Sequence, residues 1–325
     1  KLILYKGKPS IQVSFKDVNQ QIIAKKELAK RELMFRGMFE NVHHGMVVAD
    51  EKGFIISANK PENIDYTTYG INEALVIDNT GVFRDLDALK RHLKSKGAKK
   101  VLLTAPGKGI PNIVHGVNHL EYSPNTTDIF SAASCTTNAI TPILKVIEDN
   151  CGIIHGHLET IHAYTNDQNL VDNMHSKYRR GRAAALNMVI TETGAGKAVS
   201  KALPSLENRL TSNAIRVPVP NGSLAILNLQ IKKSVTLNKI NNLIKGAALS
   251  GNLVEQIKYE LNNELVSSDI VGCTAPAIYD SKATIVRSDG KNIIIYIWYD
   301  NEFGYSHQVI RLAKYIAKVR RFTYY

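Results

Sequence analysis

The sequence predicts two units in one chain, a doubly wound parallel α/β sheet followed by an α+β unit built on a mostly antiparallel sheet. Between about residues 74 and 147, short apolar runs alternate with amphipathic helical stretches, which is typical of βαβ units. After Gly152 the apolar runs lengthen and alternate with a period of two, which indicates antiparallel strands. The length of 325 residues is sufficient for two domains.

Each predicted element follows from its local pattern. In the first unit we expect strands at 74–78 (ALVID) and 100–105 (KVLLTA), and helices near 85–96 and from Thr137 to Ile147. In the second unit we expect strands at 156–163, 212–217, 223–231, 281–286 and 292–299, and helices near 235–248 and 304–317. The first 60 residues contain short strand candidates (LILY, IQVSF, MVV and FIIS) and one amphipathic helix near 21–39.

Composition narrows the class of protein. Lys and Arg exceed Asp and Glu by 12 (41 against 29), which fits either a solvated basic surface or attraction to phosphorylated metabolites, a nucleotide cofactor or nucleic acid. No apolar run approaches the ~20 residues of a membrane span. The three cysteines lack the spacing of a zinc site, so no metal is expected, and so sparse a number fits a reducing compartment such as the cytoplasm.

Cys135 is the leading candidate for a nucleophile. The run SAASCTTN places it just before a predicted helix, where exposed N–H groups favour a thiolate and can also hold an oxyanion. A buried structural cysteine is the alternative, but the neighbouring Ser and Thr residues are too polar for a core position. His162, 27 residues later at the end of a predicted strand, is the candidate acid/base partner.

Several motifs occur in a specific order: SCTTN, LETIHAYTNDQNLVD, TETGAGKAVSKALP, NAIRVPVPNGS and WYDNEFGYS. In this order and spacing they resemble phosphorylating glyceraldehyde-3-phosphate dehydrogenase, from about Asn59 to the C-terminus, in a variant branch of that family. The resemblance implies an enzyme of glycolysis and gluconeogenesis that uses NAD or NADP. Cys135 would form a thiohemiacetal with the aldehyde, His162 would move the proton, and hydride loss would give a thioester that inorganic phosphate cleaves to an acyl phosphate.

The resemblance also implies further site residues. The phosphate ligands would be Ser134, Thr136, Thr165, Thr193, Gly194 and Arg216. The cofactor would contact Asn79, Thr80, Gly81, Thr104, Asn301 and Tyr305. Without the resemblance, Arg216 would be interpreted as an ordinary salt-bridge arginine and Thr193-Gly194 as a turn. The basic stretch 175–187 would serve subunit contacts, a cofactor phosphate or only a solvated surface.

One part of the family pattern is missing. A dehydrogenase of this type should open with a strand and a Gly-rich turn for the pyrophosphate, and no such turn is found here. Three explanations stay open: a sequence that is incomplete at its start, a remodelled nucleotide half, or a relative that lost turnover. The choice between NAD and NADP therefore stays open.

We expect a nucleotide-binding domain at 1–134, a catalytic domain at 135–300 and a C-terminal helix at 301–325 that returns to the first domain. A homotetramer acting on a phosphorylated aldehyde and inorganic phosphate is the family expectation, without membrane contact. Two alternatives are a related sugar-phosphate or semialdehyde dehydrogenase and a non-catalytic basic scaffold that binds RNA. No RNA-recognition motif with interleaved aromatic residues supports the last one.

Overall fold

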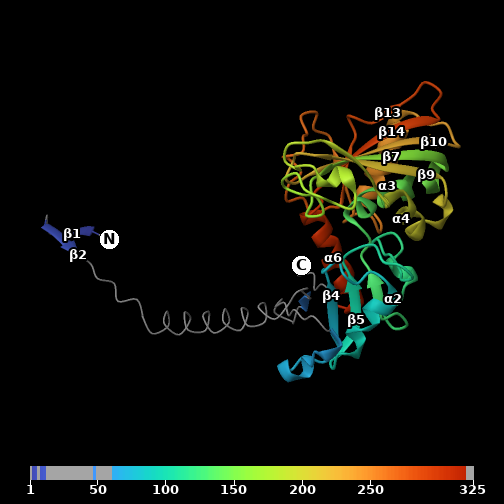
Figure 1. Cartoon of the computed structure of the whole chain (residues 1–325). Helices are drawn as coiled ribbons and strands as arrows, with labels where there is room; N and C mark the ends of the chain where they lie inside the picture. The colour runs from blue at the N-terminus through green and yellow to red at the C-terminus, as the bar shows by residue number, and fades with distance from the viewer. Residues whose placement is uncertain (1, 6–7, 12–46, 49–60, 320–325) are drawn as a thin grey trace.

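The computed structural model describes residues 2–5, 8–11, 47–48 and 61–319. In the N-terminal part, β1 (Leu2–Tyr5) pairs antiparallel with β2 (Lys8–Ile11). The helix expected near 21–39 and the strand expected at FIIS lie outside the described residues. From residue 61 onward the chain forms two sheets, and its last helix crosses back to the first of them (Figure 1).

The first sheet has four strands in the order β3-β4-β5-β6. They are β3 (Val47–Val48), β4 (Ala74–Asp78), β5 (Ala98–Leu103) and β6 (Ile129–Ser131). The strands β4, β5 and β6 are parallel, whereas β3 runs antiparallel to β4. The carboxyl ends of the three parallel strands therefore meet at one edge, where ligands of such sheets bind.

Helices cover both faces of this sheet, as the doubly wound prediction requires. Leu102 on β5 packs with the buried side of α6 (Phe303–Ile316). Its neighbours Val101 and Leu103 point to the other face and pack with Leu89 of α2 (Leu86–Lys90). The alternation along β5 thus follows from the period of two in a strand that is buried on both faces.

The second sheet has the order β11-β12-β14-β10-β7-β9-β8, and β13 pairs with β14. Its strands are β7 (Ile153–Ala163), β8 (Val189–Glu192), β9 (Leu210–Val217), β10 (Ser223–Ile231), β11 (Ile257–Glu260), β12 (Ala277–Asp280), β13 (Ile285–Val286) and β14 (Asn292–Tyr299). Most pairs are antiparallel, as predicted, but β7 with β9 and β11 with β12 are parallel. Short 3₁₀ helices in the connections are η1 (Pro61–Asn63), η2 (Tyr66–Tyr69), η3 (His92–Lys94), η4 (His119–Glu121), η5 (Tyr178–Gly181) and η6 (Pro204–Leu206).

Three helices cover one face of the second sheet: α3 (Cys135–Cys151), α4 (Ala195–Ala202) and α5 (Leu237–Leu249). The buried isoleucines of β14 alternate with half-buried residues, so the strand presents every second side chain to this core. No helix among the described residues covers the opposite face. This open face is relevant to assembly, as discussed below.

The structure corrects several predicted boundaries. Helix α3 begins at Cys135 rather than Thr137, because the Ser134 side chain caps it by accepting a hydrogen bond from the Thr137 N–H at 3.2 Å. Thr193 and Gly194 lie just before α4, and Gly194 is the N-cap residue of this helix. The strand expected at 281–286 is shortened to β13 (Ile285–Val286), because the Asp280 carboxylate accepts the N–H groups of Lys282 and Ala283 and turns the chain after β12.

Packing of α3 predicts a large effect of one core substitution. Ile143→Ala should lower the free energy of unfolding by roughly 2–5 kcal/mol, because the side chain is fully buried and its removal leaves a cavity. Ile310→Ala on α6 is the control, since that side chain is 48% exposed. Urea unfolding followed by circular dichroism would compare the two, and equal losses of stability would contradict the assigned core.

Candidate active site

The turn between β6 and α3 presents Cys135. Ala133 has a φ of 55°, in the left-handed region, which bends the chain sharply just before the helix. The Asn138 side-chain amide holds this bend by donating to the carbonyl oxygens of Ala132 at 2.8 Å and Ser134 at 2.9 Å. Cys135 is therefore the first residue of α3, next to N–H groups that have no partner within the helix.

His162 comes from the neighbouring strand β7, and its position follows from the sheet. The parallel register of β7 and β9 places His162 opposite Arg216. The Nε2 atom of His162 lies 3.5 Å from the Sγ atom of Cys135. The two residues predicted to act as nucleophile and base are thus brought together.

The Ala163 carbonyl oxygen orients the imidazole. His162 Nδ1 lies 2.7 Å from this oxygen, and a proton on Nδ1 would leave the Nε2 lone pair facing the thiol. The Nη1 atom of Arg216 donates to the same oxygen at 3.0 Å and also lies 2.7 Å from His162 Nδ1. If His162 is to accept the proton of Cys135, its Nδ1 atom must carry the ring proton.

Burial sets the protonation states of this pair. Burial, followed by the nearby charge of Arg216, lowers the pKa of His162 to about 4. Burial also raises the pKa of the Cys135 thiol, and hydrogen bonds with Thr136 and the charge of Arg216 only partly oppose it. The helix start was expected to favour a thiolate, but burial is the larger effect. At neutral pH the pair is a thiol beside a neutral imidazole.

Arg216 belongs to a short chain of charges. Its Nη2 atom lies 3.9 Å from an oxygen of Asp167, which also forms an ion pair with Arg180. Burial alone would raise the pKa of Asp167, but a hydrogen bond from Thr165 and the two arginine charges bring it below its ordinary value. The Nε atom of Arg216 is buried and has no hydrogen-bond partner among the described residues, so one of its donors is left unsatisfied.

The other predicted phosphate ligands lie at two places. The hydroxyl of Thr136 bonds to Tyr299 at 3.0 Å, and Ser134 is used as the helix cap, so both side chains support the protein itself. Thr193 and Gly194 lie at the start of α4, where the Thr193 hydroxyl accepts from the Ala195 N–H at 3.2 Å. No described contact joins them to Cys135.

The predicted cofactor residues lie at the carboxyl edge of the first sheet and just after β14 of the second sheet. Thr80 and Thr104 follow β4 and β5, next to Asn79 and Gly81. The side-chain oxygen of Asn301 accepts from Gly222 at 3.2 Å and Ser223 at 3.0 Å, which leaves its amide nitrogen without a partner in the described structure. Hydroxyls and a free amide donor suit a nicotinamide nucleotide.

Tyr305 supports the turn before α3. Its hydroxyl donates to the Ala133 carbonyl oxygen at 3.0 Å, so it holds the turn that presents Cys135. Two residues that motif reasoning missed support the same region. Tyr299 bridges Thr136 and Thr160, and Asp167 links two arginines. Only the loop position of Asp167, just after HAYT, indicated a role for it.

The basic segment 175–187 is partly explained by internal ion pairs. Arg180 pairs with Asp167, and Arg182 lies 3.1 Å from Asp172. No group of His, Cys, Asp or Glu side chains suited to a metal is found in the described ranges. Within the same residues, no helix is long and apolar enough to cross a bilayer.

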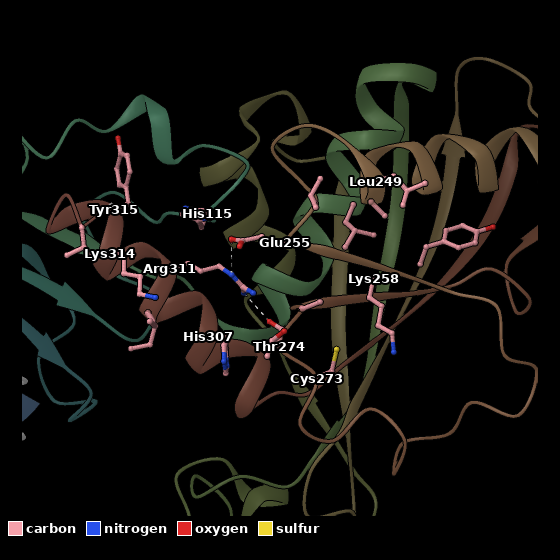
Figure 2. Close-up of a pocket in the computed structure, with 17 residues that line it drawn as sticks. His115, Leu249, Glu255, Lys258, Cys273, Thr274, His307, Arg311, Lys314 and Tyr315 are labelled. Carbon is pink, nitrogen blue, oxygen red and sulfur yellow. Dashed lines mark hydrogen bonds and ion pairs between the residues drawn. The ribbon is translucent and has the colours of Figure 1, made fainter. Parts of the chain in front are cut away.

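A cavity of about 970 Å³ lies elsewhere, between α6 and the strand β11. Arg311 crosses it, with an ion pair to Glu255 at 3.3 Å and a hydrogen bond to the Thr274 carbonyl at 3.0 Å (Figure 2). None of the predicted site residues lines this cavity. Its size alone therefore does not make it the catalytic site.

The charge of Arg216 predicts the reactivity of Cys135. Because the arginine stabilises the thiolate, Arg216→Gln should raise the thiol pKa and slow alkylation by iodoacetamide at pH 8 by about twofold to tenfold. The difference should shrink at higher pH, where both thiols are ionised. Arg287→Gln, on an exposed residue outside the site, is the control. Equal alkylation rates of the Arg216 variant and the unmodified chain would contradict this electrostatic role.

Comparison with known proteins agrees with this geometry. Residues 134–301 match the family model described as the C-terminal domain of glyceraldehyde 3-phosphate dehydrogenase. A glyceraldehyde-3-phosphate dehydrogenase-like protein of Pseudomonas aeruginosa is 48% identical over 310 residues, which cover 91% of this chain but 66% of that protein. The glyceraldehyde-3-phosphate dehydrogenases of Kitasatospora aureofaciens (42%) and Geobacillus stearothermophilus (41%) each align with 85% of this chain and 82% of their own length.

These matches include both the thiol site and most of the first sheet. The chain thus spans less than two thirds of the Pseudomonas relative and about four fifths of the other two. The chain belongs to the glyceraldehyde-3-phosphate dehydrogenase family.

Proposed function

We propose that this chain catalyses the oxidation of glyceraldehyde 3-phosphate to an acyl phosphate, with inorganic phosphate and NAD or NADP. One observation carries the proposal: the Cys135 thiol lies 3.5 Å from the Nε2 atom of His162, beside Arg216 with its unpartnered Nε. A nucleophile, a base and an anion donor at one point are what acyl transfer to phosphate requires.

The steps follow from the protonation states. His162 takes the proton of the Cys135 thiol as Sγ attacks the aldehyde carbon and forms a thiohemiacetal. The imidazolium and the N–H groups at the start of α3 stabilise the oxyanion. The bound nicotinamide would accept the hydride, which leaves a thioester on Cys135. Phosphate held by Arg216 then attacks the thioester, and the acyl phosphate leaves as the thiolate regains its proton.

The cofactor would be held by a small set of groups. The amide nitrogen of Asn301 is suited to donate to the carboxamide, while Thr80 and Thr104 would meet a ribose. Nothing in this set separates NAD from NADP. The free Cys135 thiol fits a reducing compartment, which supports a cytoplasmic location.

The rival functions are less well supported. A related sugar-phosphate or semialdehyde dehydrogenase would use the same thiol and base. The donor on Arg216 favours reaction with phosphate over hydrolysis. An RNA-binding scaffold would not need a base oriented toward a thiol.

We also propose that the chain assembles with copies of itself. On the open face of the second sheet, Leu224 pairs with Trp298 and Ile226 pairs with Tyr296, and all four side chains are only half-buried. A second apolar surface lies in the segment after β7, with the exposed side chains Val171, Met174, Tyr178, Leu186 and Met188. Two separate surfaces of this kind suit a tetramer with two kinds of twofold interface.

The activity is tested with the purified chain, glyceraldehyde 3-phosphate, inorganic phosphate and either NAD or NADP. Reduced nicotinamide should form only when phosphate is present. Cys135→Ser should abolish turnover, and His162→Asn should lower kcat by roughly 10²–10⁴-fold because the base is lost. Cys273→Ser, away from the site, should retain activity. No turnover with either cofactor would refute the proposal.

Assembly is tested by light scattering after size-exclusion chromatography. Ile226→Lys should reduce the molar mass, because a charge on the open sheet face opposes burial against a second copy. Leu120→Lys, at a 67% exposed position on the first unit, should leave the mass unchanged. A monomer for the unmodified chain would rule out the proposed assembly.

A further inference from the structure

A buried carboxylate lies at the end of β4 and takes no part in the thiol chemistry. Asp78 is the last residue of that strand, and its side chain is completely inaccessible to solvent. One carboxylate oxygen, Oδ2, lies 3.0 Å from Nε2 of His92, which is equally buried. Burying a carboxyl group and an imidazole away from water costs free energy, so the pair is expected to have a structural or functional role.

Asp78 connects both threonines of the predicted cofactor cleft. Its Oδ1 atom accepts from the N–H and the hydroxyl of Thr80, each at 2.8 Å. Its main-chain oxygen accepts from the N–H of Thr104 at 2.9 Å and from the Thr104 hydroxyl at 3.2 Å. One residue therefore joins the loops that follow β4 and β5.

These hydrogen bonds determine whether the two threonine hydroxyls can donate to a ligand or only accept from it. Each hydroxyl hydrogen is already donated to Asp78, and the Thr80 oxygen also accepts from the Val82 N–H at 3.1 Å. A ligand at this edge meets oxygen lone pairs rather than O–H donors. The threonines are thus set as acceptors, which suits a partner that carries hydroxyl donors.

His92 supports this arrangement from the rear. Its ring packs edge-on against Phe83 at a centroid distance of 5.3 Å, and its Nδ1 atom is buried without a hydrogen-bond partner among the described residues. The ring therefore has one polar contact, the bond to Asp78. Removing it would leave Oδ2 buried and without a donor.

Hydrogen bonding between neighbouring strands of the first sheet brings the cleft threonines near the segment that carries the thiol. Thr104 follows Leu103, whose carbonyl oxygen accepts from the N–H of Ala132 at 2.9 Å. Cys135 comes three residues after Ala132. A nicotinamide beside Cys135 would therefore bring its own ribose, rather than the adenosine, to these threonines.

We propose that Asp78, held by His92, is a positioning residue that fixes Thr80 and Thr104 as acceptors for the hydroxyls of the nicotinamide ribose. This inference rests on the proposed function, because it assumes a nicotinamide nucleotide in the cleft. It adds a buried pair that acts through the two threonines and does not touch the reacting atoms.

The test is isothermal titration calorimetry of the whole chain with NAD, or NADP if that is the cofactor, and separately with ADP, which lacks the nicotinamide ribose. Asp78→Asn has one acceptor oxygen where three donors converge, so it should weaken dinucleotide binding about tenfold or more. His92→Leu should weaken it similarly, and His92→Gln, which can still donate, should restore much of it. Binding of ADP should change less than about twofold.

Controls separate positioning from loss of folding. Asp85→Asn, at the exposed cap of α2, should leave dinucleotide binding unchanged. The alkylation rate of Cys135 without cofactor should be the same in all variants, and KM for the dinucleotide should rise more than kcat falls. Equal losses for ADP and the dinucleotide, a changed alkylation rate or undiminished dinucleotide binding would each overturn the inference. If the unmodified chain binds neither NAD nor NADP, the proposed function itself fails.

Discussion

The burial of helix α3 is the constraint on which the rest of the site depends. From Ala139 to Ile147 the helix is packed almost completely against the second sheet and its other helices. Because a close-packed core allows little displacement, the packing of this helix also fixes the position of its first residue. Cys135 is that residue, and the capping by Ser134 and the bend at Ala133 follow from the need to enter a buried helix from a buried strand.

Electrostatics at the site work against ionisation rather than for it. Both Cys135 and His162 are surrounded by protein, so the neutral form of each is favoured, and proton transfer accompanies the attack on a carbonyl carbon. The cation on Arg216 opposes burial only at Cys135, where it favours the thiolate, and it adds to the effect of burial at His162. Its ion pair with Asp167 is long, at 3.9 Å, which leaves much of that charge available to an anion.

Strands with a clear alternation of apolar residues were predictable from the sequence. Side-chain positions that depend on the register between strands were not. The strands at 74–78, 223–231 and 292–299 were predicted with the correct bounds, because their alternation reflects burial directly. The first turn of α3 was missed since its polar residues carry no apolar period. Arg216 lies opposite His162 only through a parallel register across 54 residues, and no local pattern specifies such a register. Asp78 ends the run ALVID, and its partner His92 could not be found without the fold.

The hydrogen bond from Tyr305 to the carbonyl of Ala133 spans 172 residues of chain. Together with Asn301, it makes the surroundings of Cys135 dependent on a segment synthesised long after the cysteine itself. On the ribosome, the thiol would leave the exit tunnel well before the residues that shape its pocket. A nascent chain would therefore carry an ordinary cysteine, and the reactive site would be completed only after α6 has docked on the first sheet.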